Sequence, residues 1–172
     1  MDGEIVNPRT TLPDGWLSPV EIKELQRLAT GRTVLELGAW KGRSTVVMAE
    51  VATYVVSVDR HQGIPEREGV ESLPDYLDNV LGLDNVAIVI AQFDRIVPLF
   101  DSFFTLCFID GSHDEQSVYQ DAMMAMEHLD GYGTIVFHDF DLDSVKKGVL
   151  RAMCKQPDNV VDSLASYEGV LA

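Results

Sequence analysis

The sequence is poor in basic residues and has no long hydrophobic run, and each shortage excludes a class of protein. Its 13 lysines and arginines stand against 28 aspartates and glutamates, which gives a formal net charge of −15. Such a surface repels phosphate backbones and anionic lipids, so we expect neither nucleic acid nor a membrane as a partner. The charge is explained by solubility or, more specifically, by a divalent cation that some carboxylates bind.

Apolar segments long enough to cross a bilayer are also missing, because none approaches the roughly 18 residues required. The first ten residues lack the apolar segment of a secretory signal. There are two cysteines, Cys107 and Cys154, and they have no metal-site spacing. Because Cys107 lies in an apolar run, we expect a reduced buried thiol and a cytoplasmic location.

The 172 residues fit one domain. Residues 1–17 show no regular pattern, and residues 18–172 are the expected domain. Ser18-Pro19-Val20-Glu21 has the form of a capping box and predicts the start of a helix. The expected strands are 33–37, 54–58, 86–91, 105–109 and 134–137, the expected helices are 44–51, 74–81, 114–129 and 144–154, and segments 159–164 and 167–171 are expected as a closing hairpin.

Strands that are apolar throughout and alternate with helices predict a doubly wound α/β fold, with helices on both faces of a parallel sheet. Gly131-Tyr132-Gly133 is expected to turn the chain into the strand 134–137. The polar segment 61–72 is interpreted as a loop, either a lid over a site or a variable surface insertion. Ligands of such folds bind beyond the carboxyl ends of the strands.

Polar residues follow the first two expected strands. Gly38 permits a tight turn and a close approach to a ligand, and Gly42 opens the next helix. Glu36 can accept a hydrogen bond from a ligand ammonium group, and Asp59 can take both hydroxyls of a ribose. The pattern favours a nucleoside-type ligand with a cationic amino-acid part. The alternative is an ordinary strand–turn–helix in which Asp59 caps a helix or lies in a loop.

A second polar group follows the strands 105–109 and 134–137. It consists of Asp110, His113, His138 and Asp139, and Asp141 is a further candidate. If these strands are neighbours, the side chains converge on one point. Such ligands suit Mn²⁺, Fe²⁺ or Zn²⁺ better than Mg²⁺ when histidine takes part. Without a metal, His113 or His138 can act as a general base, and in the third alternative both histidines have structural roles.

The segments VLELGAWKGRST, VVSVDR, FIDGSH and GYGTIVFHDFD resemble those of the class I methyltransferases that use S-adenosylmethionine (SAM). The resemblance spans about residues 16 to 172. It implies a Rossmann-like three-layer sandwich with a seven-stranded, mostly parallel sheet and an antiparallel last strand. It also implies that the methionine end of SAM lies at the first turn, the ribose at Asp59 and the adenine at Gln92 and Phe93. The residues expected at the cofactor are Glu36, Gly38, Ala39, Trp40, Gly42, Ser44, Asp59, Arg60, Gln92, Phe93 and Asp110.

The resemblance implies methyl transfer, most naturally to the hydroxyl of a small molecule, with Asp110, His113 and His138 as catalytic candidates. Related O-methyltransferases hold a divalent cation such as Mg²⁺ or Mn²⁺ here, so Asp110, His138 and Asp139 are the metal candidates. His138 departs from that pattern, because those proteins have an acid at its position. The site is expected to be open or completed by the second subunit of a homodimer. Two alternatives remain: a hydroxylase-like metal enzyme on the same fold, and a SAM-binding accessory protein without catalysis.

Overall fold

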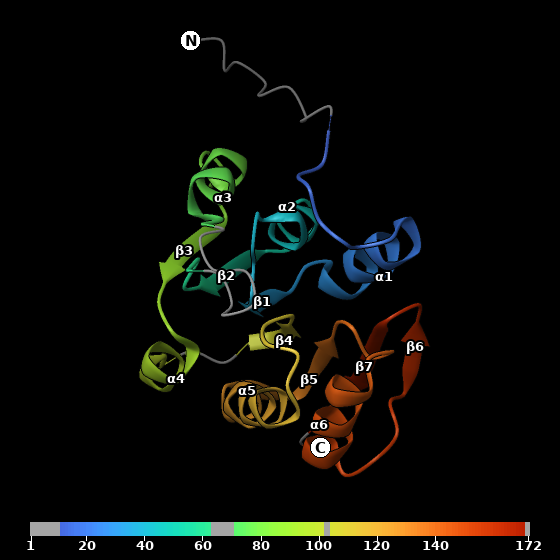
Figure 1. Cartoon of the computed structure of the whole chain (residues 1–172). Helices are drawn as coiled ribbons and strands as arrows, with labels where there is room; N and C mark the ends of the chain where they lie inside the picture. Colours follow the sequence, from blue (N-terminus) through green and yellow to red (C-terminus); the bar gives the residue numbers. More distant parts are fainter. Residues whose placement is uncertain (1–10, 63–70, 102–103, 171–172) are drawn as a thin grey trace, which may run out of the picture.

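The computed structural model describes residues 11–62, 71–101 and 104–170. In this part of the chain, seven strands form one sheet in the order β3-β2-β1-β4-β5-β7-β6, seen across the middle of Figure 1. Strands β1 to β5 run parallel, and β7 is antiparallel to both of its neighbours, β5 and β6. The strands are β1 (Thr33–Leu37), β2 (Tyr54–Asp59), β3 (Val86–Ile90), β4 (Phe104–Ile109), β5 (Leu129–Phe137), β6 (Asn159–Val161) and β7 (Leu164–Glu168). The predicted sheet, with its antiparallel last strand, is confirmed.

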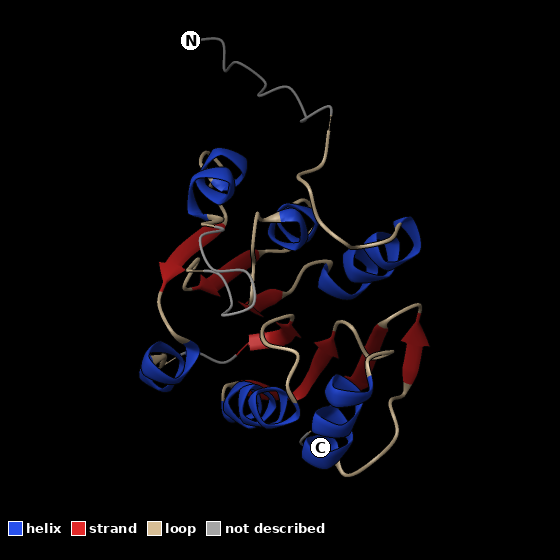
Figure 2. Ribbon diagram, viewed as in Figure 1, coloured by secondary structure: helices blue, strands red, loops and turns tan. Residues whose placement is uncertain are grey.

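Helices cover both faces of the sheet, as Figure 2 shows, and complete the three layers. One face carries α1 (Pro19–Ala29), α2 (Arg43–Ala49) and α3 (Leu73–Val80), and the other carries α4 (Phe93–Ile96), α5 (Glu115–Glu127) and α6 (Asp143–Met153). A short 3₁₀ helix, η2 (Val97–Leu99), follows α4. Each face has its own cluster of buried apolar side chains. Among the described helices, none is long and apolar enough to cross a bilayer.

The predicted capping box at the start of α1 is confirmed. The Ser18 hydroxyl accepts a hydrogen bond from the Glu21 amide at 3.3 Å, and Glu21 Oε2 accepts one from the Ser18 amide at 2.8 Å. The other carboxylate oxygen, Oε1, accepts bonds from the amide and the hydroxyl of Ser163, just before β7. The cap therefore also ties α1 to the far end of the chain.

The structure differs from the prediction at β5, at the closing hairpin, and at α4 and η2. Residues 131–133 lie inside β5 rather than before it, because the β4–β5 pairing shifts from Phe104–Leu129 to Leu106–Thr134 and the glycine segment bulges. The closing hairpin turns earlier than predicted, between Val161 and Leu164. The helices α4 and η2 were not predicted. Most of the expected loop 61–72 lies outside the described residues.

Candidate functional site

One row of paired residues fixes the edge of the sheet where the site lies. Leu37 pairs with Val58 on one side and with Ile109 on the other, and Ile109 pairs with Phe137. The residues that follow this row, namely Gly38, Asp59, Asp110 and His138, therefore leave the sheet together at its carboxyl edge. Strand β1 lies between β2 and β4, where the strand order reverses, so the row ends at the topological switch point of the sheet.

The turn after β1 is tight and is held by Asp59. Gly38 has φ +97°, and a Cβ there would overlap the carbonyl oxygen of Asp110. Asp59 Oδ2 accepts hydrogen bonds from the amides of Ala39 and Trp40 at 2.8 and 2.9 Å, and Oδ1 accepts one from the His61 amide at 2.8 Å. A carboxylate offers about four acceptor positions, so about one is left at Oδ1. The expectation that Asp59 takes both hydroxyls of a ribose stays a prediction.

Glu36 lies beneath this turn and is fully buried. The hydroxyls of Ser44 and Thr45 each donate to one of its oxygens at 2.5 Å. Burial raises the pKa of Glu36 to about 7, and hydrogen bonds from Ser44, Ser57 and Thr45 oppose this rise. The carboxylate thus holds the first turn of α2 in place, and its predicted contact with a ligand ammonium group stays a prediction.

The remaining cofactor candidates lie around the same edge. Arg60 follows Asp59 and is half-buried, Gln92 is exposed after β3, and Phe93 is half-buried. A Cβ on Gly111 would lie 2.8 Å from Phe93 Cε2, so the Phe93 ring packs against the backbone that follows β4. The Phe93 ring therefore brings the segment after β3 into contact with the segment after β4.

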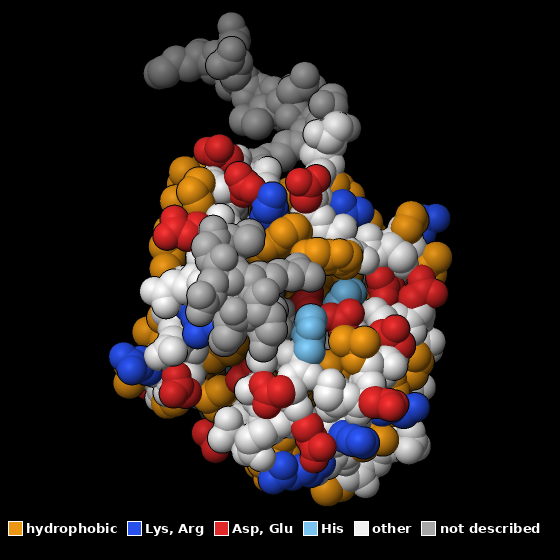
Figure 3. Space-filling view, in the orientation of Figure 1, with side chains coloured by type: hydrophobic (Ala, Val, Ile, Leu, Met, Phe, Trp, Pro, Cys, Tyr) orange, Lys and Arg blue, Asp and Glu red, His pale blue; other side chains and the backbone are white. Residues whose placement is uncertain are grey.

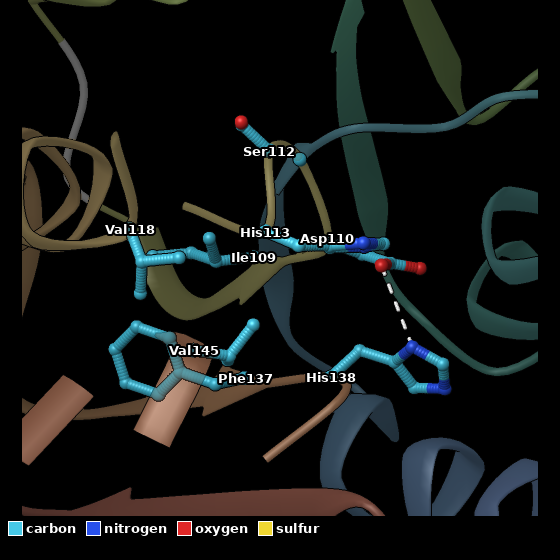
Figure 4. A pocket seen from close by; sticks show the side chains of 9 residues that line it. Ile109, Asp110, Ser112, His113, Val118, Phe137, His138 and Val145 are labelled. Atoms are coloured by element: carbon cyan, nitrogen blue, oxygen red, sulfur yellow. Dashed lines mark ion pairs between the residues drawn. The ribbon is translucent and has the colours of Figure 1, made fainter. Parts of the chain in front are cut away.

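The second polar group converges as predicted and forms what we call the His–Asp cluster: Asp110, His113, His138 and Asp139. His138 Nδ1 lies 3.4 Å from Asp110 Oδ1, the ion pair drawn in Figure 4, and 3.1 Å from Asp139 Oδ2. His113 Nε2 lies 3.0 Å from the same oxygen of Asp139. Histidine and acidic side chains gather at the centre of the face in Figure 3.

The two histidines of the cluster differ in how far they are exposed. The His138 side chain is 5% exposed, whereas that of His113 is 51% exposed. Burial lowers the pKa of His138, but Asp110 and Asp139 raise it well above its usual range. Contact with Asp139 raises the pKa of His113, against a smaller lowering by burial. Burial raises the pKa of Asp139, but the two histidines lower it far below its usual range. His138 is therefore the buried imidazole beside two carboxylates, and His113 is the accessible one.

Glu21 is a member of this site that the sequence reasoning missed. Its side chain is 3% exposed, and its Oε2 lies 3.8 Å from His138 Nε2. The capping box gave Glu21 a local role, and nothing in its spacing indicated a contact with residues after β5. Asp110, His113 and Asp139 each offer one atom to a group within 4.8 Å, which suits a metal ion. Asp141, the further candidate, is exposed and is not part of this group.

A cavity of about 10 Å³ lies beside the cluster, with Ile109, Val118, Phe137 and Val145 as its apolar wall (Figure 4). This volume is at the lower limit for one water molecule. An organic molecule of several atoms therefore does not fit in this cavity.

Comparison with known proteins identifies the class. The model of a methyltransferase domain family matches residues 35–140. This span is more than half of the chain, and the chain belongs to that family. No curated protein matches the sequence.

Solved structures share the fold. The O-methyltransferase TomG from Streptomyces achromogenes, involved in tomaymycin synthesis and in complex with SAM, is 20% identical with a TM-score of 0.63, over 82% of this chain and 69% of its own. An O-methyltransferase from Bacillus cereus in complex with SAH is 20% identical with a TM-score of 0.63, over 82% and 70%. An rRNA methylase from Streptococcus thermophilus is 13% identical with a TM-score of 0.62, over 90% and 98%. Identities this low establish the fold alone.

Proposed function

We propose that this protein is a SAM-dependent methyltransferase that methylates a hydroxyl oxygen of a small molecule. The observation that carries the proposal is the His–Asp cluster, which lies beside the glycine turn at the switch point of the sheet. The accessible imidazole of His113 is paired with a carboxylate there, and this is the group that removal of a hydroxyl proton requires. The net charge of −15 favours a small acceptor over a nucleic acid.

The residues at the edge of the sheet fit SAM. Gly38 lets the backbone come close to a ligand because a side chain there would meet Asp110. Asp59 Oδ1 keeps an acceptor position for one ribose hydroxyl, and Ser44 is buried beneath the turn, where its hydroxyl donates to Glu36. Phe93 and the exposed side chain of Ile90, at the end of β3, offer apolar surface to an adenine. When bound, SAM supplies an electrophilic methyl group on its sulfonium.

The protein must then place the acceptor oxygen in line with that methyl group and remove its proton. His113 takes the proton as the new O–CH₃ bond forms and the C–S bond breaks, which leaves S-adenosylhomocysteine and protonated His113. Asp139 orients the His113 ring through Nε2 and stabilises the imidazolium. His138 is buried and lies beside both Asp110 and Asp139, so we assign it a positioning role rather than that of the base.

This mechanism uses no metal, although Asp110, His113 and Asp139 would suit Mn²⁺. The His138 ring lies within 3.4 Å of both carboxylates, and as an imidazolium it would offset one of their two negative charges. We therefore assign the charge-balancing role to His138. Calorimetric titration with Mn²⁺ tests this assignment. We expect the wild-type protein to bind Mn²⁺ no more tightly than the Asp139→Asn variant does. Asp141→Asn, which changes an exposed acid outside the cluster, is the control. If the wild-type protein and Asp141→Asn bind Mn²⁺ and Asp139→Asn does not, the cluster is a metal site and this assignment is refuted.

Calorimetric titration with S-adenosylhomocysteine tests the cofactor. We expect the protein to bind it, and Asp59→Ala to weaken binding at least about tenfold, because a charged hydrogen bond and the anchor of the turn are lost. Asp84→Ala removes an exposed aspartate before β3 and serves as the matched control. No binding by the folded wild-type protein, or equal affinities of all three proteins, would refute the cofactor site.

A further inference from the structure

The two outer strands of the sheet differ in how they are protected from pairing with another chain. At one edge, β6 has only three residues, and the exposed acids Asp158 and Asp162 flank it. At the other edge, which Figure 1 shows next to α3, all five residues of β3 are apolar and at least partly exposed. Short length and charged side chains are common devices that keep an edge strand from pairing, and β3 has neither.

The backbone groups that β3 directs away from the sheet follow from its pairing with β2. Just after β3, the Ala91 amide donates to the carbonyl of Asp59, so Ala91 faces β2. Because the direction of these groups alternates along a strand, the other odd-numbered residues of β3 also face β2, and Val86, Ile88 and Ile90 face outward. In the described part of the chain, no strand lies beyond β3 to bind these outward groups.

Helix α3 adds an apolar flank to this edge. The buried residues of the helix face the sheet, and its two acids, Asp75 and Asp78, line a surface hollow with Lys41, in the turn before α2. Helical spacing places Leu77 and Leu81 on the other flank, away from α2 and toward the edge of the sheet. Leu81 is 61% exposed. The acids of α3 therefore point away from the edge, and its leucines extend the apolar surface of β3.

Charge favours a second copy of this chain as the partner of this edge. Two chains of net charge −15 repel each other, so they can associate only where carboxylates are few. Within β3 and on the outer flank of α3 there are none. The exposed Asp84 precedes β3, and Asp94 and Arg95, which balance each other, follow it. Antiparallel pairing of two β3 strands sets each Asp84 beside this neutral end of the other copy and keeps the two Asp84 side chains apart.

We infer that β3 pairs in antiparallel fashion with β3 of a second copy of this chain, about a two-fold axis at Ile88, so that the two sheets become one. The Ile88 amide of each copy then donates to the Ile88 carbonyl of the other, and each Ile90 amide donates to the opposite Val86 carbonyl. The facing side chains are Ile88 with Ile88 and Ile90 with Val86, β-branched pairs that stabilise neighbouring strands. The inference is independent of the proposed function.

Sedimentation equilibrium at physiological ionic strength tests the pairing. We expect the wild-type protein to have twice the mass of the single chain, and Ile90→Lys to weaken association at least about tenfold, because pairing would bury the new charge. Ile90 is 52% exposed, so the substitution leaves the core intact. Val160→Lys, a change at a 47% exposed residue of the other edge strand, is the matched control and should stay dimeric. A monomeric wild-type protein, or equal association of all three proteins, would overturn the inference.

Amide hydrogen exchange locates the contact without relying on a variant. The outward amide of Ile88 should exchange at least about tenfold more slowly in the concentrated wild-type protein than after dilution to the monomer. The amides of Ala87 and Val89 face β2 and should be protected equally in both states, so they are the internal control. A dimer in which the Ile88 amide exchanges as fast as in the monomer would show that the copies meet at another surface, and would refute the inference.

Discussion

At the scale of single residues, several carboxylates are buried in the described part of the chain without a close ion pair that would neutralise them. Glu36 has two hydroxyl donors but no cation, and Glu21 relies on Ser18, Ser163 and the distant charge of His138. Asp121 on α5 is 7% exposed, and its carboxylate faces the backbone of Gly111. Burial raises the pKa of Asp121 to about 7, and the charges of Asp114 and Asp94 add to the rise.

This shift predicts that Asp121→Asn stabilises the protein at alkaline pH. The folded-state pKa of about 7 lies above the ordinary value of 3.8, so the neutral form favours folding below pH 3.8 and this contribution is lost as pH rises through about 7. We expect the variant to match wild type near pH 4 and to gain about 2 to 4 kcal/mol near pH 8. Urea unfolding at both pH values measures this.

Glu115→Gln, an exposed acid on the same helix, is the control for the change in net charge. A gain for Asp121→Asn that is equal at both pH values, or equal to that of Glu115→Gln, would contradict the prediction.

At the scale of elements, the turn between β1 and α2 decides how close β1 and β4 come. Gly38→Ala would force a Cβ against Asp110 while keeping a positive φ, so we expect it to cost several kcal/mol, about 3 or more. Gly31→Ala has a φ of +69° but nothing within 4 Å of its Cβ, so it should cost about 1 kcal/mol. Urea unfolding measures the loss of unfolding free energy in each variant. Gly31→Ala reports the effect of a positive φ alone, and Gly38→Ala adds the steric overlap with Asp110. Equal losses would show that the turn relaxes to relieve the overlap.

How far the sequence predicts each element depends on whether the deciding interaction is local. Apolar runs that end in a polar residue placed Gly38, Asp59, Asp110 and His138 at one edge correctly, because parallel strands end together. The early start of β5 was missed because it depends on pairing with β4. The contact of Glu21 with His138 was missed because it joins distant segments. The orientation of Glu36 depends on the hydroxyls of α2, which a pattern along one strand cannot show.

At the scale of the whole molecule, the formal charge of −15 opposes folding through self-repulsion. Raising sodium chloride from about 0.01 M to about 0.15 M shortens the screening length from about 30 to about 8 Å. We therefore expect the melting temperature to rise by about 2 to 4 °C. Differential scanning calorimetry measures this, with glucose at equal osmolality as the uncharged control. A lower melting temperature in salt would mean that attractive ion pairs outweigh the repulsion.

The bond between Glu21 and Ser163 joins residues that are 142 positions apart. During synthesis, α1 leaves the ribosome long before β7, so this bond forms only after nearly the whole chain has emerged. The buried carboxylate beside His138 is therefore held by two segments from opposite ends of the domain, and its final hydrogen bonds form late in synthesis.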